Sequence, residues 1–269
     1  MIQEINKCEV GPGEMAVWWL GQMSFIVKAG DHVIYLDPYL SPNPRRQVAP
    51  FFKPEDVTNA TIITGSHDHS DHIDRPAWPA LAKASPGAKF VVPDLLRKHL
   101  AEEMDIPIDR FVGLDDGASV EIDGARITGV ASAHEFLDVD PDTGRHPYLG
   151  FVFEVGGFTF YHSGDSCKYE GLEGKLRAWR FDLLCLPING RDAERLGRGC
   201  IGNMTYQEAV DLAGALMPRM VIPGHWDMFA GNPGDPDAFT KYANVKYSDL
   251  SVRVPRQGEC VRMQGIGDR

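Results

Sequence analysis

The chain has 269 residues, of which 43% are hydrophobic, and its 13 Phe, 8 Tyr and 5 Trp can fill a sizeable core. Its net charge is −11 and it has no basic cluster, which argues against a nucleic-acid partner, because affinity for nucleic acid comes mainly from Lys and Arg that neutralise phosphates. The sequence contains no apolar run that could span a bilayer and no apolar signal core near its start, so we expect neither membrane association nor secretion.

The first half of the chain, about residues 1–130, opens with three predicted strands between residues 14 and 37. Asp37 ends the third strand, where it can cap a turn or accept a hydrogen bond that orients a metal-bound histidine. Residues 41–58 are rich in Pro and polar groups and predict a loop that reaches over a site. The later elements that we expect are a strand at Thr61–Thr64, helices at Pro76–Lys83 and Leu95–Met104, and strands at Lys89–Val92, Arg110–Val112, Ser119–Glu121 and Arg126–Ser132.

Between the strand at Thr61–Thr64 and the next helix lies a dense group of metal-binding residue types: His67, His69, Asp71, His72 and Asp74. Imidazole and carboxylate together suit zinc, manganese or iron. Two residues that alternate in an extended segment can bind one ion from one side. Asp71 and His72 are then available for a neighbouring ion or for a bound water. We therefore predict a metal site on this loop, where a rigid scaffold presents functional groups.

The second half, about residues 131–269, begins with a strand that runs into His134 and continues with a polar loop at 136–147. We interpret His146, on that loop, as a surface residue, with contact to substrate as the alternative. A hairpin follows, because two apolar runs flank Gly156-Gly157. The elements that we expect here are strands at Tyr148–Val155, Phe158–His162, Asp182–Pro187, Arg219–Ile222, Leu250–Val254 and Gly258–Met263, and helices at Tyr169–Trp179, Met204–Leu216 and Asp235–Tyr242.

Both halves repeat a run of strands followed by helix, strand and helix, and the sequence contains no linker. We therefore predict a single α/β domain over 1–269, built from two similar halves with two sheets packed between outer helices. The cysteines are odd in number and scattered, without a CxxC pair, which favours free thiols in a reducing, cytoplasmic compartment: Cys8, Cys167, Cys185, Cys200 and Cys260. Cys167 lies two residues after Asp165, and we interpret it as a small packed thiol.

Three further candidate ligands, His134, Asp165 and His225, each follow a short apolar strand, as the histidine-rich loop does. Functional residues of layered α/β folds gather at such strand ends. Together these side chains suffice for two ions, each with three or four protein ligands and a position left for water. Asp165 can bridge the two ions, although its neighbours Gly164 and Ser166 also allow a role in a turn.

The string HDHSDH at residues 67–72 resembles the HxHxDH signature of the metallo-β-lactamase fold hydrolases, and Asp37, His134, Asp165 and His225 stand in the order of that family's other motifs. Within it, four strings are similar to the bacterial L-ascorbate-6-phosphate lactonases: AVWWLG at 16–21, SHDHSDHID at 66–74, YHSGDS at 161–166 and VIPGHWDMF at 221–229. Cys167 stands where these lactonases carry a histidine.

The resemblance implies a four-layer αββα sandwich with two divalent metal ions at one edge, zinc or manganese. It places His67, His69 and His134 on one ion and Asp71, His72 and His225 on the other, with Asp165 between them. It also implies a homo-oligomer. Di-iron relatives with a flavin partner carry a glutamate at the place of His69, so redox chemistry is disfavoured.

These features predict a metal-dependent hydrolase in which an activated water attacks a small lactone or ester, including a sugar-phosphate lactone. Asp71 orients that water or passes its proton to the leaving group. Asn189, Arg191 and Arg198 follow a neighbouring strand and are candidates to bind an anionic substrate, with a surface salt bridge as the alternative for the arginines. Two other functions stay open, a phosphodiesterase of the same fold and a metal-binding protein without turnover.

Overall fold

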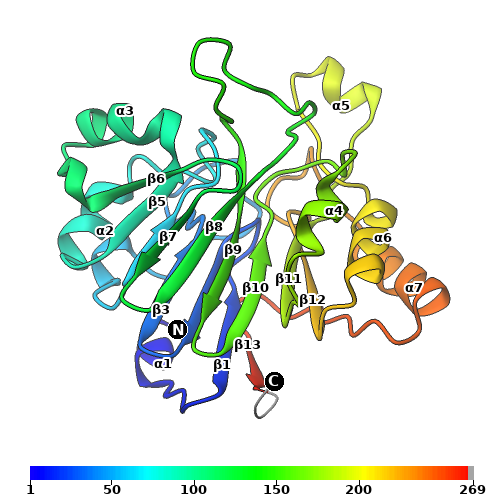
Figure 1. Cartoon of the computed structure of the whole chain (residues 1–269), viewed down its shortest axis with the longest axis horizontal. Helices are drawn as coiled ribbons and strands as arrows, with labels where there is room; N and C mark the ends of the chain where they lie inside the picture. Colours follow the sequence, from blue (N-terminus) through cyan, green and yellow to red (C-terminus); the bar gives the residue numbers. More distant parts are fainter. Residues whose placement is uncertain (266–269) are drawn as a thin grey trace.

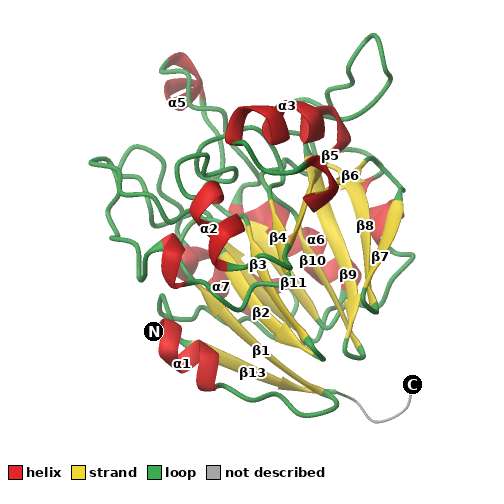
Figure 2. Cartoon of the chain, turned by 90° about the vertical axis from the view of Figure 1, so that its left-hand side faces the viewer, coloured by secondary structure: helices red, strands yellow, loops and turns green. Residues whose placement is uncertain are grey.

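The computed structural model describes residues 1–265, and it places two β-sheets face to face between outer helices (Figures 1 and 2). Helices α2 and α3 cover the sheet of the first half, and α4, α6 and α7 cover the sheet of the second half (Figure 1). The predicted αββα sandwich is confirmed. Within the described residues, no helix combines the length and the hydropathy that a membrane span requires.

The first sheet has the strand order β13-β1-β2-β3-β4-β5-β6. Neighbours are antiparallel from β13 to β3 and parallel from β3 to β6. The last strand of the chain thus pairs with the first one, and the C-terminal segment completes the sheet of the N-terminal half. The strands are β1 (Glu14–Trp19), β2 (Phe25–Ala29), β3 (His32–Leu36), β4 (Ile62–Thr64), β5 (Lys89–Pro93), β6 (Phe111–Leu114) and β13 (Cys260–Gln264).

The second sheet has the order β12-β11-β10-β9-β8-β7 and repeats this design. Neighbours are antiparallel from β7 to β10 and parallel from β10 to β12. In each sheet the parallel strands direct their carboxyl ends to one edge, which is where the site is built. The strands are β7 (Ser119–Ile122), β8 (Ala125–Ala131), β9 (Leu149–Val155), β10 (Phe158–His162), β11 (Leu183–Pro187) and β12 (Met220–Gly224).

Burial explains the layers, since the described residues form three apolar clusters. The inner cluster joins the facing sides of the two sheets, with Phe25 and Leu36 from the first and Phe151 and Phe160 from the second. One outer cluster packs α1, α2 and α3 on the first sheet, and the other packs α4, α6 and α7 on the second. Most strands are therefore buried on both sides, which is why their sequences read as continuous apolar runs.

The helices differ more from the prediction than the strands do. The helix expected at Tyr169–Trp179 is wrong in extent, because Gly171 has a left-handed conformation (φ 94°) and only Leu172–Leu176 is helical. The short helices α1 and α5 were not predicted. The helices are α1 (Ile2–Lys7), α2 (Trp78–Ala84), α3 (Asp94–Met104), α4 (Leu172–Leu176), α5 (Ala193–Gly197), α6 (Tyr206–Leu216) and α7 (Pro236–Lys246), with 3₁₀ turns at Pro54–Asp56 and Ile108–Arg110.

The strand predicted at Leu250–Val254 is also wrong, because this segment forms only an isolated bridge between Val252 and Val221 of β12. Pro255 follows directly and offers no backbone N–H, so the pairing with β12 cannot extend along the chain in that direction. The cap of α6 lies at Thr205, where the side chain accepts a hydrogen bond from Glu208 N.

Two hairpin turns, one from each half, touch each other between the sheets. An added Cβ at Gly156, in the β9–β10 turn, would lie 2.6 Å from Gly30 N and 2.9 Å from Ala29 C in the β2–β3 turn. Gly157, the next residue, also has a positive φ (83°) but meets no atom within 4 Å. The two glycines therefore separate the effect of a close approach from that of backbone conformation.

We predict that Gly156→Ala destabilises the protein by about 2–3 kcal/mol, because strain at positive φ adds to a backbone clash between the halves. Gly157→Ala, the matched control, carries only the cost of the left-handed conformation, about 1 kcal/mol. Urea unfolding of both variants measures the difference. Equal losses would show that the two turns do not need to approach each other.

Candidate metal centre

Seven potential ligands converge at the edge where the strands of both sheets end. The first sheet contributes the loop after β4, and the second contributes the residues that follow β8, β10 and β12. Strands far apart in the sequence therefore bring their polar ends to one place, as in other layered α/β proteins. The convergent side chains are those predicted: His67, His69, Asp71, His72, His134, Asp165 and His225.

One group of ligand atoms consists of three imidazoles. His69 Nδ1 lies 2.9 Å from His67 Nε2 and 3.2 Å from His134 Nε2. The second group joins Asp71, His72 and His225, whose ligand atoms lie within 4.8 Å of one another. Asp165 lies between the two groups: its Oδ1 is 3.3 Å from His72 Nε2, and its Oδ2 is 3.0 Å from His225 Nε2 and 3.9 Å from His134 Nε2.

These separations fit ligands that share an ion. Two atoms bound to zinc at about 2.0–2.1 Å lie about 2.9–3.4 Å apart when the angle between them is 90–109°. The separations of His69 from His67 and His134, and of Asp165 from His72 and His225, are 2.9 to 3.3 Å and fall in that range. Asp165 lies farther from His134, at 3.9 Å, and Asp71 lies 3.7 and 3.9 Å from His72 and His225. The donors are nitrogen and oxygen only, a set compatible with zinc or manganese.

Asp37 fixes which nitrogen of His72 is available. It is fully buried in a left-handed conformation (φ 43°), and its Oδ2 lies 2.7 Å from His72 Nδ1. Ser66 and Thr64 donate further hydrogen bonds to the same carboxylate. Because the carboxylate accepts the Nδ1 proton, the Nε2 lone pair of His72 faces the centre. Asp37 thus has the predicted position of an acceptor that orients a ligand.

The pairing of His72 with Asp165 calls for a positive charge between them. His72 Nε2 and Asp165 Oδ1 are both buried and have no hydrogen-bond partner among the described residues. Burial lowers the pKa of His72, but the carboxylates of Asp165 and Asp71 outweigh it and raise that pKa well above its ordinary value. A divalent cation satisfies both groups without a proton, so the residues fit a metal site.

The three-histidine group has the opposite electrostatics. Burial lowers the pKa of His134 to about 4, and burial together with His72 lowers the pKa of His67 well below its ordinary value. Both imidazoles are therefore neutral near pH 7, with lone pairs available to a metal ion.

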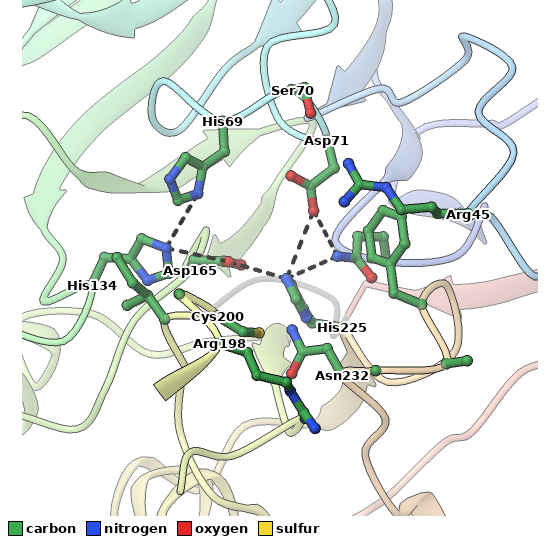
Figure 3. Close-up of a pocket in the computed structure, with 16 residues that line it drawn as sticks. Arg45, His69, Ser70, Asp71, His134, Asp165, Arg198, Cys200, His225 and Asn232 are labelled. Atoms are coloured by element: carbon green, nitrogen blue, oxygen red, sulfur yellow. Dashed lines mark hydrogen bonds and ion pairs between the residues drawn. The ribbon is translucent and has the colours of Figure 1, made fainter. Parts of the chain in front are cut away.

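A cavity of about 580 Å³ opens above both groups. In Figure 3, His69 and His134 lie on one side of this cavity and Asp71 and His225 on the other, with Asp165 between them. Of the loop predicted to reach over the site, residues 41–58, Arg45 lines the cavity, and Arg46 forms an isolated β-bridge with Phe229. The later part of this loop packs elsewhere, because Phe52 and Val57 belong to the outer cluster of the first sheet. The site is thus a concave, partly covered pocket of the kind that binds small molecules.

The three residues predicted to bind substrate have different places. Arg198 lines the cavity, although it also pairs with Glu194 at 2.8 Å. Arg191 binds both carboxylate oxygens of Glu208, at 2.5 and 2.7 Å, which is the salt bridge considered as its alternative. Asn189 is buried and donates to Asn232 at 3.0 Å. Asn189 and Arg191 line a separate, neighbouring cavity of about 350 Å³.

Three other residues lie outside the metal groups. His146 is half-buried and pairs with Asp115 at 2.9 Å, and it does not line the cavity. Cys167 is buried, with its Sγ 3.6 Å from Gly202 O, in keeping with a packed thiol. Asp74, the last acid of the histidine-rich loop, accepts hydrogen bonds from Leu40 N and Ser41 N and so holds the start of the covering loop.

Sequence reasoning missed Gln22 and Arg45. Gln22 lies in the β1–β2 turn, where a Gly-Gln pair predicts a turn and nothing more. In the structure its Nε2 lies 2.6 Å from Asp71 Oδ2 and 2.9 Å from His225 Nε2. The only available signal was the string AVWWLG, which ends one residue before Gln22.

Comparison with known proteins supports a family assignment. A model described as β-lactamase superfamily domain matches residues 16–225. A UPF0173 metal-dependent hydrolase of Pyrococcus abyssi is 30% identical over 244 residues, which cover 90% of this chain and 97% of the relative. Another from Methanosarcina mazei is 25% identical over 254 residues, 93% of this chain and 99% of the relative. Igni18, a metallo hydrolase of Ignicoccus hospitalis, shares the fold, with a TM-score of 0.73 at 21% identity, covering 93% of this chain and 99% of Igni18.

The chain therefore belongs to the β-lactamase superfamily and, within it, to the UPF0173 metal-dependent hydrolases. Both relatives are named metal-dependent hydrolases, and this chain matches 97% and 99% of their lengths. Its own His/Asp groups are candidate metal sites.

We predict that Asp37→Asn lowers metal affinity about 10- to 100-fold, because an amide nitrogen cannot accept the hydrogen bonds that one carboxylate oxygen accepts now. Metal content after dialysis against a graded chelator measures the change, and circular dichroism checks the fold. Asp31→Asn, at an exposed turn before β3, is the control. Unchanged metal retention in Asp37→Asn would contradict an orienting role for Asp37.

Proposed function

We propose that this metal-dependent hydrolase cleaves small lactones or esters that carry an anionic group, and that two divalent cations, zinc or manganese, occupy its centre. The observation that carries the proposal is the pair of ligand groups beside the 580 Å³ cavity, with Asp165 between them. This volume suits a metabolite-sized substrate and is small for a macromolecule.

We assign different roles in hydrolysis to different side chains. The two groups would hold divalent cations, and such cations would supply an activated water near neutral pH and polarise a substrate oxygen. Asp71 lines the cavity with a partly exposed carboxylate, which orients the attacking water and takes up or passes on its proton. Gln22 Nε2 donates to that carboxylate at 2.6 Å, and His225 Nε2 lies 3.9 Å from it.

The position of Arg45 supports the proposal that the substrate carries an anionic group. It is exposed, lines the cavity, and reaches toward Asp71 in Figure 3. Arg198 lines the same cavity from the loop after α5. In a chain with a net charge of −11, two arginines in the cavity lining provide local attraction for a carboxylate or phosphate, which arginine can bind through two hydrogen bonds. The similarity of four strings to the L-ascorbate-6-phosphate lactonases makes a sugar-phosphate lactone one member of this class.

The test is a substrate panel with metal-free and metal-loaded protein. The panel contains lactones and esters with and without a carboxylate or phosphate, together with bis(p-nitrophenyl) phosphate. We expect lactone or ester hydrolysis to disappear with a chelator and return with zinc or manganese. Faster turnover of the phosphodiester would favour the phosphodiesterase alternative, and no turnover in any class would favour a protein that only binds metal.

For Arg45→Ala we predict an increase in KM of about tenfold for anionic esters, because a hydrogen bond to a charged group contributes about 1.5 kcal/mol or more. Values of kcat and the kinetics of neutral esters stay close to those of the parent. Arg126→Ala removes an arginine of β8 outside the cavity lining and is the control. An equal effect on neutral and anionic esters would rule out anion recognition by Arg45.

We also propose that the protein is a cytoplasmic homo-oligomer. All five cysteines are free, which suits a reducing compartment. Phe136, Leu137 and Val139 are 67%, 41% and 49% exposed on the loop that follows His134, and such apolar surface supports contact between subunits. Light scattering should give a mass that is a multiple of 29.8 kDa and that falls in Phe136→Ser. A parent that is monomeric at every concentration would contradict this.

A further inference from the structure

The backbone of Gln22 is held in place by two residues about 200 positions away and by one near neighbour. Its N donates to Asp227 Oδ1 at 2.8 Å, and its O accepts from His225 N at 2.8 Å and from Trp19 Nε1 at 2.9 Å. The residue adopts a left-handed conformation (φ 52°), which is unfavourable for a side chain larger than glycine. Three hydrogen bonds thus stabilise a strained turn that aims one side chain at the candidate metal centre.

The orientation of the Gln22 amide follows from its partners. Asp71 Oδ2 can only accept, so the group 2.6 Å from it is the NH₂ end of the amide. The same nitrogen lies 2.9 Å from His225 Nε2, and the side chain is 1% exposed. A single uncharged donor therefore lies between two members of the Asp71, His72 and His225 group, and it makes no contact of this kind with the three-histidine group.

We propose that Gln22 is a positioning residue for one of the two ions: its amide holds Asp71 so that the carboxylate faces His72 and His225. This inference rests on the two-ion centre of the proposed function. The donor is neutral and does not titrate, so it orders the carboxylate without removing its negative charge. The Asp71 carboxylate then keeps one orientation, in which it can bind the ion and also contact the attacking water.

The alternative is that Gln22 only stabilises the turn. Its backbone contacts would persist with another unbranched side chain, whereas the contact with Asp71 would be lost. Gln22→Met therefore separates the two roles, because methionine has nearly the same length, tolerates the same backbone and cannot donate. Gln22→Ala is a second variant that removes the contact without placing a thioether next to Asp71.

The experiment titrates metal-free protein with cobalt(II) and follows the visible absorption of the bound ion, without any substrate. We expect the parent to bind two equivalents. In Gln22→Met and Gln22→Ala, one equivalent keeps the parent affinity and the other weakens by about 10- to 100-fold, as for other residues that orient ligands. The thermal unfolding midpoint of the metal-free protein stays close to that of the parent.

Gln257→Met is the matched control, since Gln257 also donates an amide N–H to a carboxylate, that of Asp227, beside the same turn but outside the ligand groups. Parent-like binding of both equivalents in the Gln22 variants would overturn the proposal. So would equal weakening of both equivalents with a lower unfolding midpoint, which would assign Gln22 a purely structural role. A parent that binds one equivalent would instead refute the two-ion centre, and the Gln22 proposal would fail with it, whereas a failed substrate panel would leave this result intact.

Discussion

The hydrogen bond between His72 Nδ1 and Asp37 Oδ2 is the interaction on which the arrangement of the centre depends. At 2.7 Å, inside a fully buried pair, it fixes the tautomer of His72 and turns Nε2 toward Asp165 on the opposite sheet. Asp37 is itself held by Thr64 and Ser66, the residues that lead into the histidine-rich loop. The end of β3 thereby orders the loop after β4, and that loop meets ligands from the second sheet.

The strands and layers of the fold were largely predictable because each depends on local sequence and on burial. Apolar runs that end at paired glycines or at Gly-Asp steps are buried on both faces, as Phe158–His162 shows. The short helices were less predictable. α1 depends on Lys28, a buried lysine of β2 that donates to the carbonyl oxygens of Ile5 and Cys8, and this contact has no signature in residues 1–8.

The metal ligands were predictable from the sequence, whereas the residues around the candidate substrate cavity were less so. Histidines and aspartates at strand ends converge because the fold brings strand ends together, so residue type and local position were sufficient to identify them as candidates. The place of Arg191 depends on Glu208, which lies 17 positions further along and also caps α6. Gln22 depends on Asp71 and His225, at separations of 49 and 203 residues. Such contacts are decided by tertiary structure alone.

Residues with strained backbone conformations also gather around the candidate metal centre. Seven residues other than glycine have positive φ in the described part of the chain, and four of them belong to the centre or adjoin it: Gln22, Asp37, Glu135 and His225. Each follows a strand or a ligand at the edge where the sheets meet, so the chain must turn sharply there to direct a side chain inward. A left-handed conformation costs about 1–2 kcal/mol per residue, and packing and hydrogen bonds elsewhere offset it. Strain of this kind persists where it serves a site. At His225 the turn is held by the bond from its N to Gln22 O, so one contact supports two strained residues and joins the β1–β2 turn to the end of β12.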